Sequence, residues 1–378
     1  MIFSIIIFII TLLVLVLIHE LGHFLVAKRF NIKVLEFGFG LPPKVWGKKF
    51  GETIFSLNWL PFGGFVKLLG EDEVDKKMLE NHRSFAAQGV DKRILVVLAG
   101  VLMNLVFAWI LFYIVLASQN FRYQIDLRVD HKFVFVSQKE EGVILITQVA
   151  ENSPAQKGGL KRGERIIALN DELISEDERL VEKTKALAGE EIKLTLSDVE
   201  KTTFRDVKVT PRKNPPSGEG PLGISLAGFK IANLQYEGLL PKLFAGPIHS
   251  WNLTAYSGKV LGHLINQSFT EGTLKPISQS VAGPVGITSL ANSILTSIEK
   301  PLIPYLNFMA ILSLNLAVVN FLPIPALDGG RLFFLILEAV IRRRIHAEVE
   351  RLIHTIGMAL LLALTVIITF SDIQKILF

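Results

Sequence analysis

Residues 1–29 read MIFSIIIFIITLLVLVLIHELGHFLVAKR, and this stretch decides the class of protein. Its apolar run is near the ~20 residues that cross a bilayer as a helix, and it ends in Lys28 and Arg29. It has no basic segment before the apolar run and no small-residue cleavage site, so we interpret it as a retained membrane helix and not as a signal peptide. The two histidines and the glutamate within it indicate that chemistry takes place inside this first span.

Three further uncharged runs, at 94–118, 301–327 and 352–371, have a similar length. Half of the 378 residues are hydrophobic and the mean hydropathy is +0.44, which is more apolar surface than a soluble core can bury. This composition excludes a purely soluble enzyme, and a charged fraction of only 20% excludes a disordered chain. We therefore predict a polytopic α-helical membrane protein with four transmembrane helices, at about 2–27, 94–118, 301–322 and 352–371.

The basic residues indicate the orientation in the membrane. The net charge is +5, and Lys and Arg are concentrated in two short loops, 28–93 and 342–351. Because short loops rich in Lys and Arg stay on the cytoplasmic side, the N-terminus, the segment 119–300 and the C-terminus are expected outside. No dense basic run with interleaved aromatic residues lies outside the membrane flanks, so we expect no nucleic-acid partner.

The loop between the first two spans contains strand-like pieces separated by Gly and Pro. They are EFGFG at 36–40, TIFSL at 53–57 and FGGFV at 62–66. We predict a β-hairpin or small sheet at about 34–70 that is associated with the membrane. Such backbone is tolerated at membrane depth only where it packs on protein or lines a wet cavity. Residues 1–118 form the N-terminal half of the predicted membrane core, and 301–378 form the C-terminal half.

The exported segment divides into two parts. Residues 153–170, SPAQKGGLKRGERIIALN, resemble the PDZ signature in which a short helix ends in a glycine turn and a strand follows. We predict an inserted α+β PDZ domain over 119–230. The loop GPLGIS at 220–225 resembles a peptide-binding loop whose backbone N–H groups capture a carboxylate or a strand; the alternative is a plain β-turn. Its candidate substrate-binding residues are Leu222, Gly223 and Ile224.

Residues 231–300 are predicted to be an amphipathic linker region at the membrane surface. Their uncharged pieces are interrupted by Pro, His and Lys, which favours a surface helix over a fifth span.

The first span contains HELGH at 19–23, an H-E-x-x-H motif. On a helix the two histidines share one face, so both can bind one metal while Glu20 reaches a metal-bound water as a general base. Placing such groups in an apolar helix costs several kcal/mol, with about 2.5–3.5 kcal/mol for one central charge, which favours a functional site. The alternative is that the side chains reach the cytoplasmic interface, one or two turns from Lys28.

Zinc held by two histidines needs a third protein ligand. The chain has no cysteine, which also excludes a disulfide scaffold and an iron–sulfur protein. Other histidines are less suitable as ligands. His131, His249 and His263 lie in the exported segment, and His346 and His354 follow the third span without a motif around them. A carboxylate is favoured, and Asp328 follows the uncharged run 301–327, where Pro323 and Pro325 break the helix and let the side chain point inward. The alternative is an N-cap for a helix that starts near Gly330.

Together, HELGH in the first span, the LDGG element after the third and the PDZ-like segment between the second and third are similar to the site-2 protease family of intramembrane zinc metalloproteases. The bacterial group that cleaves anti-sigma factors resembles this chain most, over essentially its whole length. Many members of that group carry two tandem PDZ domains, whereas this chain has room for one. Other matching elements are GGFVK at 63–67, GVLMN at 100–104 and AGPVGI at 282–287.

The resemblance implies Zn²⁺ as the cofactor, with His19, His23 and Asp328 as ligands and Glu20 as the catalytic acid/base. It also implies that the sheet at 34–70 pairs with the substrate strand. Gly63 and Gly64 belong to this sheet and are candidate substrate-binding residues. Asn104, Asn315 and Asn320 lie at positions where polar residues of the family line the site. For the three asparagines an interhelical hydrogen bond is the alternative.

The expected function is regulated intramembrane proteolysis of single-pass membrane proteins by an intramembrane zinc metalloendopeptidase, with Glu20 assisting the attack of a zinc-bound water. Anti-sigma factors and remnant signal peptides are the expected substrates. We expect a monomer in contact with membrane lipid, in the inner membrane of a bacterial cell, with the PDZ domain on the periplasmic side and the active site near the cytoplasmic side. The alternatives are a non-catalytic scaffold with a vestigial metal site and a metal transporter, although the sequence shows no inverted repeat.

Overall fold

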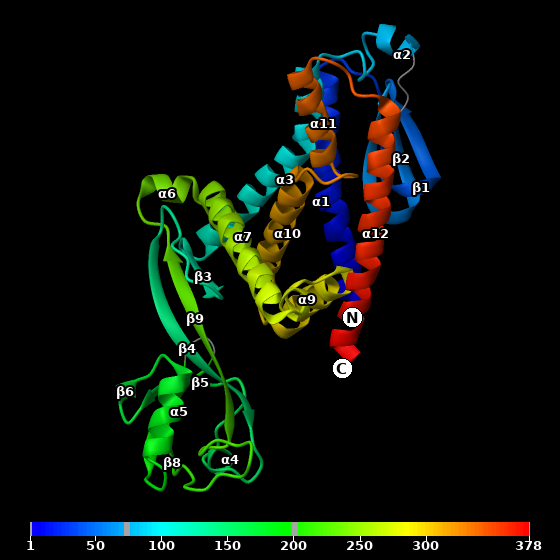
Figure 1. Ribbon diagram of the computed structural model, residues 1–378. Helices are drawn as coiled ribbons and strands as arrows, with labels where there is room; N and C mark the ends of the chain where they lie inside the picture. Colours follow the sequence, from blue (N-terminus) through cyan, green and yellow to red (C-terminus); the bar gives the residue numbers. More distant parts are fainter. Residues whose placement is uncertain (1, 72–75, 199–202, 378) are drawn as a thin grey trace. The chain divides into compact units, whose positions relative to one another are not determined.

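The computed structural model describes residues 2–71, 76–198 and 203–377. The chain forms two compact units. One consists of Met1–Ser118 and Phe244–Phe378, and we call it the membrane unit; the other consists of Gln119–Leu243, and we call it the inserted unit (Figure 1).

Four apolar helices dominate the membrane unit. They are α1 (Ile2–Arg29), α3 (Val90–Ser118), α10 (Leu302–Phe321) and α12 (Ala347–Leu377). All four are long and apolar enough to cross a membrane, and they are the ones that qualify among the described residues. The structure therefore contains the four apolar helices that the sequence predicts as membrane spans.

Helix α3 lies at the centre of this unit. Of its apolar stretch 44% is buried, against 6% for α12. Its contact with α1 is close, because a Cβ atom on Gly22 would lie 2.2 Å from the carbonyl oxygen of Ala99. Small residues at such a crossing let two backbones approach within the membrane. On its other side α3 packs against α10, with Phe112 and Leu314 in a shared apolar cluster.

Strands β1 (Val34–Phe50) and β2 (Thr53–Leu68) form an antiparallel sheet beside α1. Both strands bend, so the first part of β1 pairs on one side with 54–57 and on the other with 64–68. The segment 64–68 is therefore an edge of this sheet. The aromatic ring of Phe24 on α1 contacts the rings of Phe37 and Phe55, which holds the sheet against the helix.

The remaining helices of the membrane unit are shorter or less apolar. They are α2 (Lys76–Glu80), α7 (Ala245–Glu271), α8 (Lys275–Ser280), α9 (Pro284–Ser297) and α11 (Asp328–Ile341). Helix α7 packs on α3 through a face that buries His249, whose ring lies 4.8 Å from that of Phe112. The opposite side of α7 exposes Trp251 and Phe269.

The inserted unit is an α+β structure built on one antiparallel sheet. Its strands are β3 (Arg122–Leu127), β4 (Ser137–Val149), β5 (Arg165–Leu169), β6 (Glu172–Leu173), β7 (Ile192–Ser197), β8 (Phe204–Val209) and β9 (Ile224–Gln235). The order is β3-β9-β4-β5-β7-β8, with β6 paired to β5. The helices are α4 (Pro154–Lys157), α5 (Asp177–Ala186) and α6 (Leu239–Leu243). Alternating apolar residues of the strands and Leu180 of α5 form its core.

The domain boundary expected at 230 falls inside strand β9. This strand pairs with β4 on one side and, from Lys230 to Gln235, with β3 on the other. The region 231–300 is therefore not one linker. Its first part completes the inserted unit, and its later helices, α7 to α9, belong to the membrane unit.

Candidate metal centre

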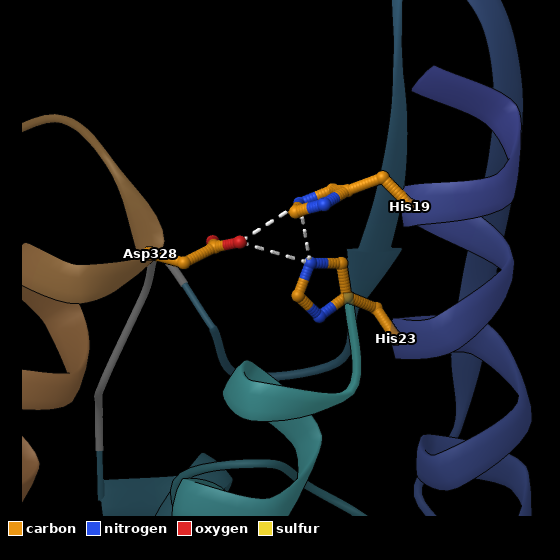
Figure 2. Close-up of side chains that lie close together, drawn as sticks. All are labelled: His19, His23 and Asp328. Carbon is orange, nitrogen blue, oxygen red and sulfur yellow. Dashed lines mark hydrogen bonds and ion pairs between the residues drawn. The ribbon is translucent and has the colours of Figure 1, made fainter. Parts of the chain in front are cut away.

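The side chains of His19, His23 and Asp328 converge on one point of the membrane unit (Figure 2). The two histidines stand one turn apart on the same face of α1, so their rings reach the same place. Their Nε2 atoms are 3.2 Å apart. The Oδ2 atom of Asp328 lies 2.8 Å from Nε2 of His19 and 3.3 Å from Nε2 of His23.

Asp328 reaches this point because the chain breaks before it. Helix α10 ends at Phe321, and α11 begins at Asp328 after a loop that contains Pro323 and Pro325. The position that caps α11 is Leu327, so the Asp328 carboxylate faces the histidines instead of capping the helix. The loop is held by a hydrogen bond of 2.9 Å that the backbone N–H of Ala326 donates to Nδ1 of His354 on α12.

Each histidine has a polar partner on α3 at its second ring nitrogen. Nδ1 of His23 donates to the carbonyl oxygen of Val96 at 2.8 Å, which leaves Nε2 free to bind a metal. Nδ1 of His19 lies 3.3 Å from the side-chain amide nitrogen of Asn104, whose Oδ1 is buried without a hydrogen-bond partner among the described residues. Turning this amide by 180° lets Oδ1 accept a hydrogen bond from Nδ1 of His19, and Nε2 is then free as well.

The donor set fits zinc. Two imidazole nitrogens and one carboxylate oxygen are the ligands of a catalytic zinc site, which keeps a fourth position open. With metal–ligand bonds of about 2.0–2.1 Å, tetrahedral geometry places neighbouring donor atoms about 3.3 Å apart. The separations of 2.8, 3.2 and 3.3 Å are close to this value. The cluster can therefore accept such an ion with small shifts of the side chains.

Glu20 lies next to these donors but outside their cluster, at the edge of the sheet. A Cβ atom on Gly64 of β2 would lie 3.3 Å from Cγ of Glu20, so this glycine lets the sheet approach the glutamate. The neighbouring Gly63 has a φ of +84°, which favours glycine. The structure thus brings Glu20, Gly64 and Asn104 together with the cluster.

Other candidate residues lie elsewhere. Asn315 is exposed on α10 and Asn320 is half-buried near its end, and neither has a hydrogen bond to the cluster in the described part of the chain. In the inserted unit, Leu222 is buried in the core and Gly223 turns the chain with a φ of +72°. Ile224 begins β9 and lies at the surface of a groove.

Several residues at the site had no signal in the sequence. The carbonyl of Val96 is a backbone group that any residue would supply. His354 has no motif around it. Gly100 belongs to the GVLMN element, which does not indicate its role, yet a Cβ atom there would lie 2.4 Å from Nε2 of His23. Its missing side chain is what leaves room for the imidazole.

Gly100→Ala is therefore expected to weaken zinc binding about tenfold, because the new methyl group displaces Nε2 of His23, one of the three candidate donor atoms. Zinc affinity in competition with a chelator measures the effect. Gly262→Ala on α7 is the matched control, since no atom lies within 4 Å of the added methyl group. Equal zinc affinity of Gly100→Ala and the wild type would contradict this geometry.

Comparison with known proteins identifies the family. The model of peptidase family M50 matches residues 7–364. A Clostridium acetobutylicum protein, provisionally named a zinc metalloprotease, is 32% identical over 373 residues, which cover 98% of this chain and 97% of that protein. Zinc metalloprotease RasP of Geobacillus kaustophilus is 29% identical over 447 positions, covering 98% of both chains. Regulator of sigma E protease of Haemophilus influenzae is 28% identical over 453 positions, covering 97% of this chain and 98% of that protein.

The match extends over nearly the whole chain, and the resemblance to the site-2 proteases is confirmed. The chain therefore belongs to peptidase family M50, and it is a multi-pass membrane metalloprotease whose metal is zinc.

Proposed function

We propose that this protein is an intramembrane endopeptidase that cleaves single-pass membrane proteins within the bilayer. The observation that supports it most is the position of the donor cluster. Two histidines of a membrane helix and an aspartate at the start of α11 meet beside a glutamate and the edge of a sheet. Polar groups of this kind are costly at such a depth and mark a functional site.

His19, His23 and Asp328 are the proposed zinc ligands. The Val96 carbonyl fixes the ring of His23 and leaves its Nε2 unprotonated, and Asn104 does the same for His19 once its amide is turned so that Oδ1 accepts from Nδ1. When bound, zinc acidifies a water molecule and polarises the scissile carbonyl group. The negative charge of Asp328 balances part of the charge of the ion.

Glu20 is the proposed acid and base. Its carboxylate lies beside the ligands without being one of the three converging donors. It accepts a proton from the attacking water and passes that proton to the nitrogen of the leaving amine. A carboxylate at this place serves both steps without a second acid.

The edge segment 64–68 is the proposed site for the substrate backbone. The carbonyl groups of a transmembrane helix are occupied by its own hydrogen bonds, so the substrate must unwind before it is cut. An extended substrate then loses hydrogen bonds that the bilayer cannot replace, and an open sheet edge can supply them. Because Gly64 of this edge contacts Glu20, a strand paired here passes the catalytic carboxylate.

The active site is proposed to lie near the cytoplasmic side. The histidines stand in the second half of α1, whose final turn carries Lys28 and Arg29. Glu52 accepts hydrogen bonds from Lys28 and Arg83, and these bonds hold the pKa of Glu52 below its ordinary value. Three charged side chains therefore meet at this end of the unit, which makes it polar. A cavity of about 860 Å³ connects Asp328 with charged residues that water can solvate: Glu71, Arg93, Arg331, Glu350 and Arg351.

The inserted unit is proposed to be a single PDZ domain exported to the periplasmic side, where it selects or filters substrates. Its sheet and helix α5 support this assignment, with Gly223 and Ile224 at the proposed peptide site. The alignment with the Haemophilus protein spans 453 positions, more than the 378 residues of this chain, so that relative has extra sequence of the size of a small domain. Such a difference is what one PDZ domain instead of two would produce.

Anti-sigma factors and remnant signal peptides are the proposed substrates. The Haemophilus relative carries the name regulator of sigma E protease, and an anti-sigma factor is the membrane protein through which a protease regulates a sigma factor. Remnant signal peptides present the same chemistry, a single apolar helix with a small exported part. We propose the inner membrane of a bacterial cell as the location.

The purified chain in lipid nanodiscs is expected to cleave a model single-pass helix with a short exported tail. Removing zinc with a chelator is expected to abolish cleavage, and adding one equivalent of zinc to restore it, because the ligands remain in place. Mass spectrometry of the fragments locates the cut. Cleavage that continues in the zinc-free protein, or a cut outside the apolar helix, would contradict the proposal.

A further inference from the structure

Strand β9 of the inserted unit has an open edge. It pairs with β4 along its length, but β3 covers only Lys230–Gln235 on its other side. Among the described residues, no strand pairs with 224–229 on that side, where β3 has already ended. An unpaired row of N–H and C=O groups is a template for an added strand.

A groove of about 480 Å³ separates this open edge from helix α5. Its floor is apolar and consists of Ile224, Leu226 and Val181, whereas its rim on the helix is acidic. The acidic residues are Asp177, Glu178 and Glu182, and none of them forms an ion pair within the described part of the chain. Two basic residues of α5, Arg179 and Lys183, are directed to Glu172, with which both form ion pairs.

The two ends of the groove differ in charge. Asp177, at the start of α5, lies against Gly228, where a Cβ atom would be 2.5 Å from the carboxylate carbon. At the Ile224 end the guanidinium of Arg212 lies beside Gly223, 2.9 Å from where a Cβ atom would be. Nε of Arg212 is buried without a hydrogen-bond partner among the described residues, although Nη2 pairs with Glu219.

This charge difference sets the direction of a bound strand. The acids of α5 repel the terminal carboxylate of a peptide toward the Ile224 end, where Glu219 balances the charge of Arg212, and a cationic side chain is attracted to the Asp177 end. The peptide then runs antiparallel to β9, as β3 does. Its last side chain lies over the apolar floor near Ile224.

The spacing of helix and strand determines which residue of the peptide meets the acids. Asp177 and Val181 are four residues apart on α5, or about 6 Å along the helix axis. Two residues of a strand span about 6.6 Å. A peptide with its last side chain beside Val181 therefore has the side chain two residues upstream beside Asp177 and Glu178.

We propose that this groove binds peptide ends with an apolar last residue and Lys or Arg two residues before it, and that Asp177 and Glu178 select the basic side chain. The inference rests on the proposed role of the inserted unit in engaging substrates, and it names the class of ligand. The relevant ligands are the carboxyl-terminal ends of exported protein segments.

Fluorescence anisotropy of labelled decapeptides with the full-length Glu20→Gln protein in nanodiscs tests this proposal, since that variant is not expected to cut the probe. A peptide that ends in Lys-Ala-Val is expected to bind roughly fivefold to tenfold more tightly at low salt than one that ends in Glu-Ala-Val. The Lys-Ala-Val peptide with a terminal amide is expected to bind more weakly than the free acid, because the carboxylate is lost. Equal affinity for the Lys and Glu peptides would overturn the selectivity, and failure of all three to bind would overturn the groove itself.

Charge variants assign the effect to the helix. Asp177→Asn with Glu178→Gln is expected to remove the preference, and Asp177→Lys with Glu178→Lys to invert it. Glu140→Lys with Glu237→Lys is the matched control, since these exposed residues change the net charge of the unit equally and do not line the groove. An unchanged preference in the inverted variant would contradict the assignment. These binding results are independent of zinc-dependent cleavage, so the two proposals can fail separately.

Discussion

Glu20→Gln is expected to lower kcat for a model single-pass substrate by about 10³-fold, while the protein keeps one zinc ion per chain. The amide has the size of the carboxylate but cannot accept the proton of the attacking water, and general acid–base catalysis contributes about 10²–10⁴-fold. Zinc is retained because the three converging donors belong to His19, His23 and Asp328. Single-turnover cleavage in nanodiscs and metal analysis of the same sample measure the two quantities.

Glu52→Gln is the matched control for this variant. Glu52 lies near the same end of α1, where it pairs with Lys28, and it is not one of the residues that surround the donor cluster. Its replacement is expected to leave kcat within about twofold, as for most changes of surface ion pairs. Cleavage by Glu20→Gln at the wild-type rate would exclude Glu20 as the acid and base. Loss of zinc from it would show that Glu20 holds the metal.

The membrane architecture could be predicted because the bilayer imposes a simple rule on the sequence. An uncharged run of about 20 residues is typical of a membrane span, so the sequence predicts four spans. Their predicted ends differ by a few residues from those of α1, α3, α10 and α12. The same rule drew attention to His19, Glu20 and Asp328, which are polar residues in or beside apolar runs. Their convergence in space could not be read from spacing alone.

Contacts between distant parts of the chain were outside the reach of the sequence. Val96 acts through its carbonyl group and His354 through a hydrogen bond to a backbone N–H, and neither contact depends on a local pattern. The boundary at 230 was wrong because β9 has two neighbours, and its second partner, β3, is about a hundred residues earlier. The sequence pattern places Leu222 in a peptide-binding loop, but its side chain completes the core of the inserted unit.

Asp328→Asn is expected to lose zinc and cleavage together, and it distinguishes zinc binding from the helix-capping role that is the alternative in the sequence. Asparagine caps a helix about as well as aspartate, so a capping role would survive the change. A neutral amide is a much poorer zinc ligand than a carboxylate, so zinc affinity is expected to fall by more than the roughly 10–100-fold that outer-shell changes cost. Metal content after dialysis against a chelator measures the loss, with the exposed Glu348→Gln on α12 as a matched control.

Together, the two amide variants test which carboxylate binds the metal. Glu20→Gln and Asp328→Asn each replace one carboxylate by its isosteric amide within the same site. Because Asp328 lies 2.8 Å from a ligand nitrogen and Glu20 stands outside the cluster, only the second variant should release the metal. Full zinc content in Asp328→Asn would mean that the third ligand lies elsewhere. If zinc is lost, a thermal unfolding curve in nanodiscs that matches the wild type excludes a damaged protein as the explanation.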